Sequence, residues 1–290
     1  MALDLLSHGK GGKVHFRAES ERLQKALKRD GAALVARSLV ARLADAIRDN
    51  AHEIQTDGII PIAWLAGENR EFHDYFPTSS WAFRGLMKHL PADAFAGDFI
   101  DIGCGLGRAL IMAADCPFPS LLGIDISDRL VETARRYVEI AVPSKRANDI
   151  RFQVADATKA PMGETATLFY FCNPFRGEPL IANLQNIAAS VDRAPRNAYI
   201  VFNNTRHIGQ IESRLNWLEP RLRIRFEHPC AIYAIKRRYV IDRSEVMPDF
   251  ASRSPLGKFV VEATTVRWST NGPLARIVHP RRDFGLASMA

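Results

Sequence analysis

The most regular hydrophobic pattern runs from residue 97 to residue 236, where short apolar runs alternate with longer segments of helical periodicity. The apolar runs predict strands at residues 99–102, 121–126, 150–154, 167–172 and 198–202. The segments between them predict helices at residues 108–114, 127–142, 179–189 and 208–218. Strands that alternate with helices are typical of an α/β fold with a doubly wound, mostly parallel sheet. The unbroken apolar run Leu168-Phe169-Tyr170-Phe171 predicts a strand that is buried on both faces.

The end of this region has a different pattern. Apolar runs at residues 223–226 and 231–235 are separated by only a short turn, so we expect these two strands to be antiparallel. Beyond residue 238, prolines 248, 255, 273 and 280 interrupt the periodicity. We therefore predict a core domain at residues 96–238 and a C-terminal extension at residues 239–290.

The N-terminal region, residues 1–95, is predicted to form a helical cap. Its apolar residues recur at helical spacing and predict a long amphipathic helix that ends near Ile54: Leu34, Val35, Leu39, Val40, Leu43 and Ile47. We interpret this stripe as a packing surface rather than a partner site. Three aromatic residues follow, and they either line a pocket or join the cap to the core: Trp64, Phe72 and Trp81. Ser79 or Ser80 is predicted to cap a short helix that ends near His89.

Composition changes this picture little. The chain has 290 residues, of which 47% are hydrophobic and 24% charged, as in ordinary globular proteins. Its four cysteines form no C-x-x-C pair and have no histidine cluster beside them, so we predict no metal site, reduced thiols and a cytoplasmic location. We expect no secretory signal and no membrane contact, because no apolar run approaches the ~20 residues of a membrane span.

The stretch Phe99–Arg108 carries the first candidate chemistry. An apolar run ends in Asp101, glycines follow at positions 103, 105 and 107, and a helical run begins at Arg108. Such a turn lets backbone N–H groups and a helix N-terminus approach a ligand closely. The dinucleotide fingerprint G-x-G-x-x-G does not fit, because its third glycine position holds Arg108. A diphosphate would be repelled by Asp101, whereas a cofactor with an α-amino group and a sulfonium would not.

Polar residues also follow the next three predicted strands. Asp125 closes the second strand, 24 residues after Asp101 and near the offset of about 20 at which an acid reaches ribose hydroxyls. Asp156-Ala157 follow the third strand, and Asn173-Pro174-Phe175 follow the fourth. In doubly wound sheets, ligands bind at the carboxyl ends of the strands. The sequence therefore predicts one ligand site at this edge of the sheet.

The D-x-G-x-G-x-G spacing and the acids that follow it resemble the class I (Rossmann-like) methyltransferases that depend on S-adenosyl-L-methionine (SAM). The resemblance covers roughly residues 72–236. It implies that SAM contacts the glycine turn, the ribose-binding Asp125 and the adenine-binding Asp156, with a cofactor set of Asp101, Gly103, Cys104, Gly105, Gly107, Asp125, Ile126, Asp156, Ala157 and Asn173. The segment Asn173-Pro174-Phe175 resembles the motif [DN]-P-P-[YF], which implies that these three residues are catalytic and position the methyl acceptor.

A narrower resemblance rests on Tyr75-Phe76-Pro77-Thr78 together with the motifs above. This set is similar to a group of mostly uncharacterised bacterial methyltransferases, whose motifs are in the style of the non-SET protein-lysine methyltransferases. It implies that Tyr75 and Thr78 fold over the cofactor. Only one proline separates Asn173 from Phe175, so the aromatic residue is displaced by one position, which weakens the case for a nucleic-acid base as acceptor.

We therefore predict a SAM-dependent methyltransferase that acts on nitrogen, with a lysine-like amine of a protein as the favoured acceptor. A small-molecule acceptor, enclosed by the cap and the C-terminal extension, is the first alternative. A catalytically silent SAM-binding partner module is the second. The net charge is +7, with nine basic and five acidic side chains in residues 237–290. The sequence nevertheless has no localised basic stripe or added RNA-binding fold, so nucleic acid is disfavoured.

Overall fold

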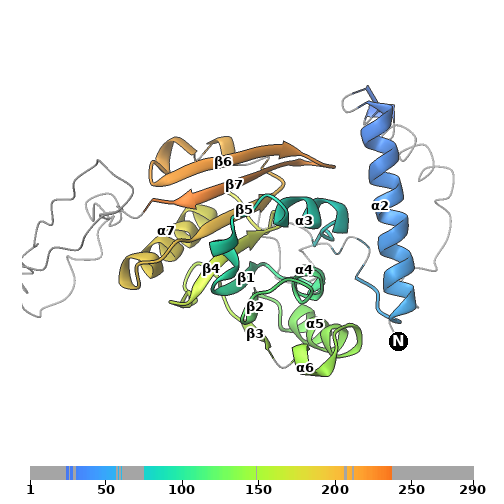
Figure 1. The fold of residues 1–290 in the computed structure, drawn as a ribbon, viewed down its shortest axis with the longest axis horizontal. Coiled ribbons are helices and arrows are strands. Elements are labelled where there is room, and N and C mark those ends of the chain that lie inside the picture. Colours follow the sequence, from blue (N-terminus) through green and yellow to red (C-terminus); the bar gives the residue numbers. More distant parts are fainter. Residues whose placement is uncertain are drawn as a thin grey trace, which may run out of the picture. The chain divides into compact units, whose positions relative to one another are not determined.

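The computed structural model describes residues 24–25, 27–28, 31–56, 58, 60, 75–147, 149–205, 208–210 and 212–236. The chain divides into two units, residues 1–241 and residues 242–290, and the second lies outside the described residues. The predicted C-terminal extension lies outside the described residues. Trp64 and Phe72, of the predicted cap, lie outside them as well. Figure 1 labels the described helices and strands.

A seven-stranded sheet forms the centre of the first unit, in the order β3-β2-β1-β4-β5-β7-β6. Its strands are β1 (Asp98–Ile102), β2 (Leu121–Asp125), β3 (Ile150–Val154), β4 (Ala166–Phe171), β5 (Tyr199–Asn203), β6 (Leu218–Arg225) and β7 (Pro229–Ile235). The first five strands are parallel, and β7 is antiparallel to both β5 and β6. All six residues of β4 are buried. The predicted mostly parallel sheet, its antiparallel end and its fully buried strand are thus confirmed.

Helices cover both faces of this sheet (Figure 1). On one face, α3 (Ser80–Met87), α4 (Arg108–Ala113) and α5 (Asp128–Ala141) pack on β-strand residues such as Phe99 and Leu168. On the other face, α7 (Gly177–Arg193) packs on residues such as Phe169 and Phe202. The short helix α6 (Ser144–Ala147) and the 3-10 turn η3 (Ala92–Phe95) lie in the connections. Among the described helices, none has the length and apolar composition that a membrane span requires.

Two predicted helix caps explain where helices begin on the first face. The side chain of Ser79 accepts a hydrogen bond from the Ala82 N–H, and α3 begins at the next residue. Ser127 accepts one from the Leu130 N–H, and α5 begins at Asp128. Both predictions of a capped helix are confirmed. The apolar residues of the predicted helix at 127–142 include Ile140, which we expected on the inner side; it is exposed instead, because its position has rotated away from the buried stripe.

The predicted helix at residues 208–218 is wrong. The described residues there form two 3-10 turns, η4 (Ile208–Gln210) and η5 (Glu212–Arg214), and Leu218 already belongs to β6. Strand β6 pairs with β7 from Leu218 to Arg225, so it begins five residues before the predicted start. The apolar residues at 208–218 have helical spacing, but spacing reflects only the local sequence. Pairing with the neighbouring strand β7 determines the structure here instead.

The long N-terminal helix is α2 (Ala32–Ala51), close to the predicted span. Its orientation contradicts the prediction that its apolar stripe is a packing surface. Val35 is buried, but four other members of that stripe are exposed: Leu39, Val40, Leu43 and Ile47. The helix instead buries Asp45 and Asp49. Trp81 does join cap and core, because its ring lies edge-on to Phe226 and beneath the Arg37 guanidinium of α2.

Candidate active site

The glycine turn between β1 and α4 is held in a conformation that glycine adopts easily. Gly103 and Gly105 have φ angles of 73° and 53°, in the left-handed region. A Cβ on Gly103 would overlap Pro174, and a Cβ on Gly105 would overlap the ring of Tyr75. The turn therefore brings together three sequence-predicted segments: itself, the loop after β4 and the segment before α3.

Two carboxyl groups lie beside this turn. The two side-chain oxygens of Asp125, at the end of β2, accept hydrogen bonds of 2.9 Å from the backbone N–H groups of Gly105 and Ser127. Burial raises the pKa of Asp125, and these hydrogen bonds oppose the rise. Asp101, on β1, is fully buried; burial first and the charge of Asp125 second raise its pKa from 3.8 to about 8. A cation placed between these groups would favour ionisation of Asp101.

The end of β3 contributes a third carboxylate. Oδ1 of Asp156 accepts hydrogen bonds from the Thr158 backbone N–H at 2.9 Å and from the Thr158 hydroxyl at 2.7 Å. Burial raises the pKa of Asp156, but these hydrogen bonds and the Lys159 charge outweigh burial and lower it. Asp156 therefore stays ionised and able to accept a hydrogen bond from a ligand amino group. The exposed side chain of Ile126 lines the cavity beside it.

The loop after β4 contains the three residues predicted to position the methyl acceptor, Asn173, Pro174 and Phe175. Asn173 has a φ of 54°, which asparagine tolerates better than most residues and which turns the chain sharply before Pro174. Phe175 is buried, with its ring edge-on to Phe171 at 6.4 Å between centroids. The predicted aromatic residue is thus a fixed wall of the site.

The predicted site residues converge on one cavity of about 820 Å³, a volume that includes its open mouth. Nearly all of the predicted set lies in its wall: Tyr75, Thr78, Asp101, Gly103, Cys104, Gly105, Asp125, Ile126, Asp156, Ala157, Asn173, Pro174 and Phe175. Gly107 does not line it; its φ is 78° and a Cβ there would press on Ala134 of α5. Its observed role is therefore to let the turn pack on α5.

Sequence reasoning missed other residues of the wall. Among them are Arg108, Ser127, Leu130 and Cys172. Each is a neighbour of a predicted residue or lies one helical turn from it, which is the signal that could have found them. Among the described residues, no three His, Cys, Asp or Glu side chains are grouped as ligands for a metal ion.

A second, smaller cavity of about 230 Å³, a volume that includes its open mouth, lies beside the loop after β4. It shares Asn173, Pro174 and Phe175 with the large cavity. Its remaining wall comes from β4, α7, β5 and the segment after β5: Phe171, Leu180, Phe202, Asn204 and Ile208. The Asn173–Phe175 loop thus borders both cavities, and the carboxyl groups Asp101, Asp125 and Asp156 line only the larger one.

The large cavity fits SAM on chemical grounds. The glycine turn forms a cradle that side chains would fill, and Asp125 and Asp156 present acceptors suited to hydroxyl and amino groups. Asp101 is poised to ionise beside a cationic ligand.

Comparisons with known proteins agree with this fit. Residues 99–192 match the family model described as a methyltransferase domain. An O-methyltransferase of Pyrenophora dematioidea is 28% identical over 125 residues, which cover 42% of this chain and 45% of that protein. The chain therefore spans less than half the length of this curated relative.

Two solved structures are similar in fold. An RNA methyltransferase from Salinibacter ruber, in complex with S-adenosyl-L-homocysteine, has 19% identity and a TM-score of 0.43, covering 57% of this chain and 97% of its own. A ribosomal protein L11 methylase from Lactobacillus delbrueckii subsp. bulgaricus has 20% identity and a TM-score of 0.41, covering 55% and 77%. The acceptors named for these proteins differ, so they indicate none for this chain. The methyltransferase-domain match and the chemistry of the cavity support a SAM-dependent methyltransferase with SAM as its cofactor.

Proposed function

We propose that this protein is a cytoplasmic SAM-dependent methyltransferase that methylates nitrogen, with a lysine-like amine of a protein as its acceptor. The observation that carries the proposal is the shared wall between the two cavities. Asn173 and Phe175 border both the cavity that fits SAM and the smaller cavity. An acceptor in the second cavity would therefore reach the first across Asn173. The resemblance of the Tyr75–Thr78 segment to protein-lysine methyltransferases also supports this acceptor.

The lining of the second cavity suits an aliphatic amine. Three phenylalanine rings, with Leu180 and Ile208, offer apolar surface against which a straight hydrocarbon stem could pack. An apolar surrounding disfavours a charged ammonium and lowers its pKa. The acceptor nitrogen would therefore be held as the neutral amine, which has the lone pair that methyl transfer requires.

Asn173 is proposed to orient this nitrogen. SAM, when bound, would supply a methyl group on a sulfonium, and the neutral amine would take that methyl group as the thioether sulfur leaves with the C–S electron pair and one N–H proton passes to solvent. The side-chain oxygen of Asn173 and its backbone carbonyl would accept N–H hydrogens and aim the lone pair. Such positioning supplies most of the catalysis in displacements of this kind.

Cofactor binding is the first test. Calorimetric titration with SAM should show binding to the intact protein and a loss of at least about 100-fold in Asp125→Ala, because a buried hydrogen-bonding charge is removed from the ligand and from the Gly105 N–H. Asp115→Ala, at an exposed position, is the matched control and should bind normally. Absence of binding to the intact protein would contradict the proposed cofactor.

The acceptor is tested with labelled SAM. Lysate from a strain that lacks the protein is incubated with the enzyme and separated into protein, nucleic acid and small molecules. The proposal expects label in protein, at lysine after digestion and mass spectrometry. Label in small molecules favours the small-molecule enzyme, and cofactor binding with no labelled fraction favours the silent module. Asn173→Ala should reduce kcat by about 10–100-fold with unchanged SAM affinity, whereas Asn50→Ala should not change kcat.

A further inference from the structure

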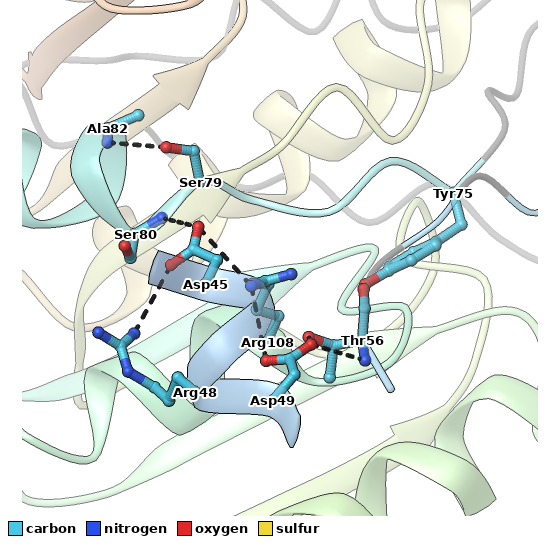
Figure 2. A network of polar contacts seen from close by, with 9 residues as sticks. All are labelled: Asp45, Arg48, Asp49, Thr56, Tyr75, Ser79, Ser80, Ala82 and Arg108. Carbon is cyan, nitrogen blue, oxygen red and sulfur yellow. Dashed lines mark hydrogen bonds and ion pairs between the residues drawn. The ribbon is translucent and has the colours of Figure 1, made fainter. Parts of the chain in front are cut away.

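Arg108 lies where the glycine turn becomes α4, and its side chain is almost fully buried, with 7% exposed. Its Nη2 atom lies 3.6 Å from Oδ2 of Asp45 and 3.5 Å from Oδ1 of Asp49 (Figure 2). Both aspartates belong to α2, about 60 residues earlier in the chain. A charged cluster therefore joins the N-terminal helix to the turn that borders the large cavity.

The two aspartates are fixed by donors other than Arg108. Oδ2 of Asp49 accepts hydrogen bonds from the Thr56 backbone N–H at 3.0 Å and from the Thr56 hydroxyl at 2.7 Å. Oδ2 of Asp45 accepts one from the Ser80 backbone N–H at 3.0 Å. These bonds set the positions of both carboxylates, so the carboxylates in turn restrict where the Arg108 guanidinium can lie.

The same cluster reaches the cavity through Tyr75. The Tyr75 hydroxyl donates a hydrogen bond of 2.7 Å to the Thr56 carbonyl, and its ring lies against Gly105. Figure 2 shows Tyr75, Thr56, Asp49 and Arg108 as one connected group. The segment that holds Asp49 therefore also holds a wall of the cavity.

The charges in the cavity wall indicate which ligand group Arg108 can bind. Of the described residues that line the cavity, three have carboxyl groups, Asp101, Asp125 and Asp156, and Arg108 alone has a cationic side chain. The methionyl part of SAM carries two positive groups, the sulfonium and the α-amino group, and one carboxylate. The lining carboxyl groups complement the positive groups, and Arg108 is the lining side chain that complements the carboxylate.

We propose that Arg108 binds the α-carboxylate of the methionyl group, and that Asp45 and Asp49 are positioning residues that hold its guanidinium at the cavity wall. This inference rests on the proposed function, since it needs SAM in the large cavity. It assigns the N-terminal helix to cofactor recognition, although none of that helix lines the cavity. A purely structural clamp is the alternative, in which Arg108 only joins α2 to α4.

The two roles are separated by a pair of ligands. S-adenosyl-L-homocysteine carries the methionyl-type carboxylate, and 5′-methylthioadenosine shares the adenosine and the sulfur but lacks the whole amino-acid group. Calorimetry on Arg108→Met should show a loss of about 10–100-fold for S-adenosyl-L-homocysteine, as expected for a charge-assisted hydrogen bond. Affinity for 5′-methylthioadenosine should change by less than about threefold. An equal loss for both ligands would assign Arg108 the structural role.

Two further measurements keep the test decisive if Arg108→Met does not fold. The triple variant Asp45→Asn, Asp49→Asn, Arg108→Met removes the three buried charges together and leaves only the partly exposed Arg48, the other ion-pair partner of Asp45, so it should show the same selective loss. In the intact protein, the analogue of S-adenosyl-L-homocysteine without its carboxylate should bind at least about tenfold more weakly than the parent. Equal affinities would overturn the proposal. Failure of the intact protein to bind any of these ligands would instead contradict the proposed function.

The aspartates are tested by the same ligand pair. Asp49→Asn keeps an acceptor for Thr56 but removes one counter-charge of Arg108, so we expect a loss of about 3–10-fold for S-adenosyl-L-homocysteine and none for 5′-methylthioadenosine. Arg42→Gln, at an exposed position of the same helix, is the matched control and should leave both affinities unchanged. A loss for Asp49→Asn that is equal for the two ligands would contradict the positioning role.

Discussion

Helices α2 and α5 both face the first unit's core, but they do so with opposite chemistry. Helix α5 buries Leu130, Val131, Ala134 and Val138, and its exposed positions are mostly charged. Helix α2 buries Asp45 and Asp49 and exposes aliphatic side chains such as Val40, of which 68% is exposed. The hydrophobic effect therefore orients α5, whereas α2 is oriented against its apolar stripe.

The reason lies in what each helix meets. Helix α5 packs on β2 and β3, whose inner residues are apolar. Helix α2 meets the buried Arg108 guanidinium, and leaving such a charge without counter-charges costs several kcal/mol. Two aspartates one helical turn apart satisfy that requirement at once. A few exposed aliphatic side chains cost less than one unpaired buried cation, so the polar contact decides the orientation.

The substitution with the largest expected effect on the free energy of unfolding tests the apolar packing of α5. Val131→Asp in α5 places a carboxylate among apolar side chains and should lower the free energy of unfolding by about 4 kcal/mol. Urea denaturation measures it, and Ile140→Asp, at an exposed position of the same helix, should change it by less than about 0.5 kcal/mol. Similar losses in both variants would mean that α5 is not held by its buried stripe.

Substitutions among the buried charges that join α2 to Arg108 should lower the free energy of unfolding less than Val131→Asp does. Asp49→Asn should lower the free energy of unfolding by about 2 kcal/mol, below the roughly 3–5 kcal/mol of a fully broken buried pair because Asp45 remains beside Arg108. The triple variant Asp45→Asn, Asp49→Asn, Arg108→Met should be more stable than Asp49→Asn, since it leaves no buried charge unpaired. A triple variant that is less stable than Asp49→Asn would show that these charges stabilise the fold.

Asp101 is a buried carboxyl group of a different kind, because it is neutral at low pH and becomes charged as the pH rises. Its pKa is raised from 3.8 to about 8 by burial and by Asp125, so the folded protein holds a proton that the unfolded chain releases. Stability should therefore fall as pH rises from about 4 to about 8, by up to about 1.4 kcal/mol per pH unit from this group. Asp101→Asn should remove this dependence in urea titrations at pH 5–8. A wild-type stability that rises across this range, with no difference in Asp101→Asn, would contradict the assigned pKa.

The same group predicts a pH dependence of binding. Because a cationic ligand favours the ionised carboxylate, SAM affinity should increase from pH 6 to pH 8, with proton release on binding. Calorimetry in two buffers of different ionisation enthalpy measures the released proton. Asp101→Asn should bind SAM with no proton release from this site.

The smallest effect concerns the exposed stripe of α2. Val40→Gln and Leu43→Gln should each change the free energy of unfolding by less than about 0.5 kcal/mol, because both side chains are already largely in water. A loss above about 1 kcal/mol in either variant, measured in urea, would restore the packing role that the periodicity predicted.

Much of the site could be predicted from the sequence. The glycine turn and the strand-end residues Asp101, Asp125, Asp156 and Asn173 all lie at the predicted cavity. They were predictable because parallel strands bring their carboxyl ends to one edge, whatever the loops between them do. Cofactor and acceptor roles of the individual residues remain predictions that the variants above test.

The sequence by itself determined the main strands and helices from residue 98 to residue 203 and the caps at Ser79 and Ser127, because each depends on residues close together in the chain. It also determined the polar residues of the cavity, because parallel strands bring their carboxyl ends to one edge. Only the tertiary structure decided which face of α2 turns inward, that residues 208–218 contain turns and the start of a strand, and that Phe175 borders two cavities. Each of these depends on a partner far away in sequence. Periodicity records which residues are apolar, but it cannot show that a buried arginine outside the helix will select its two aspartates.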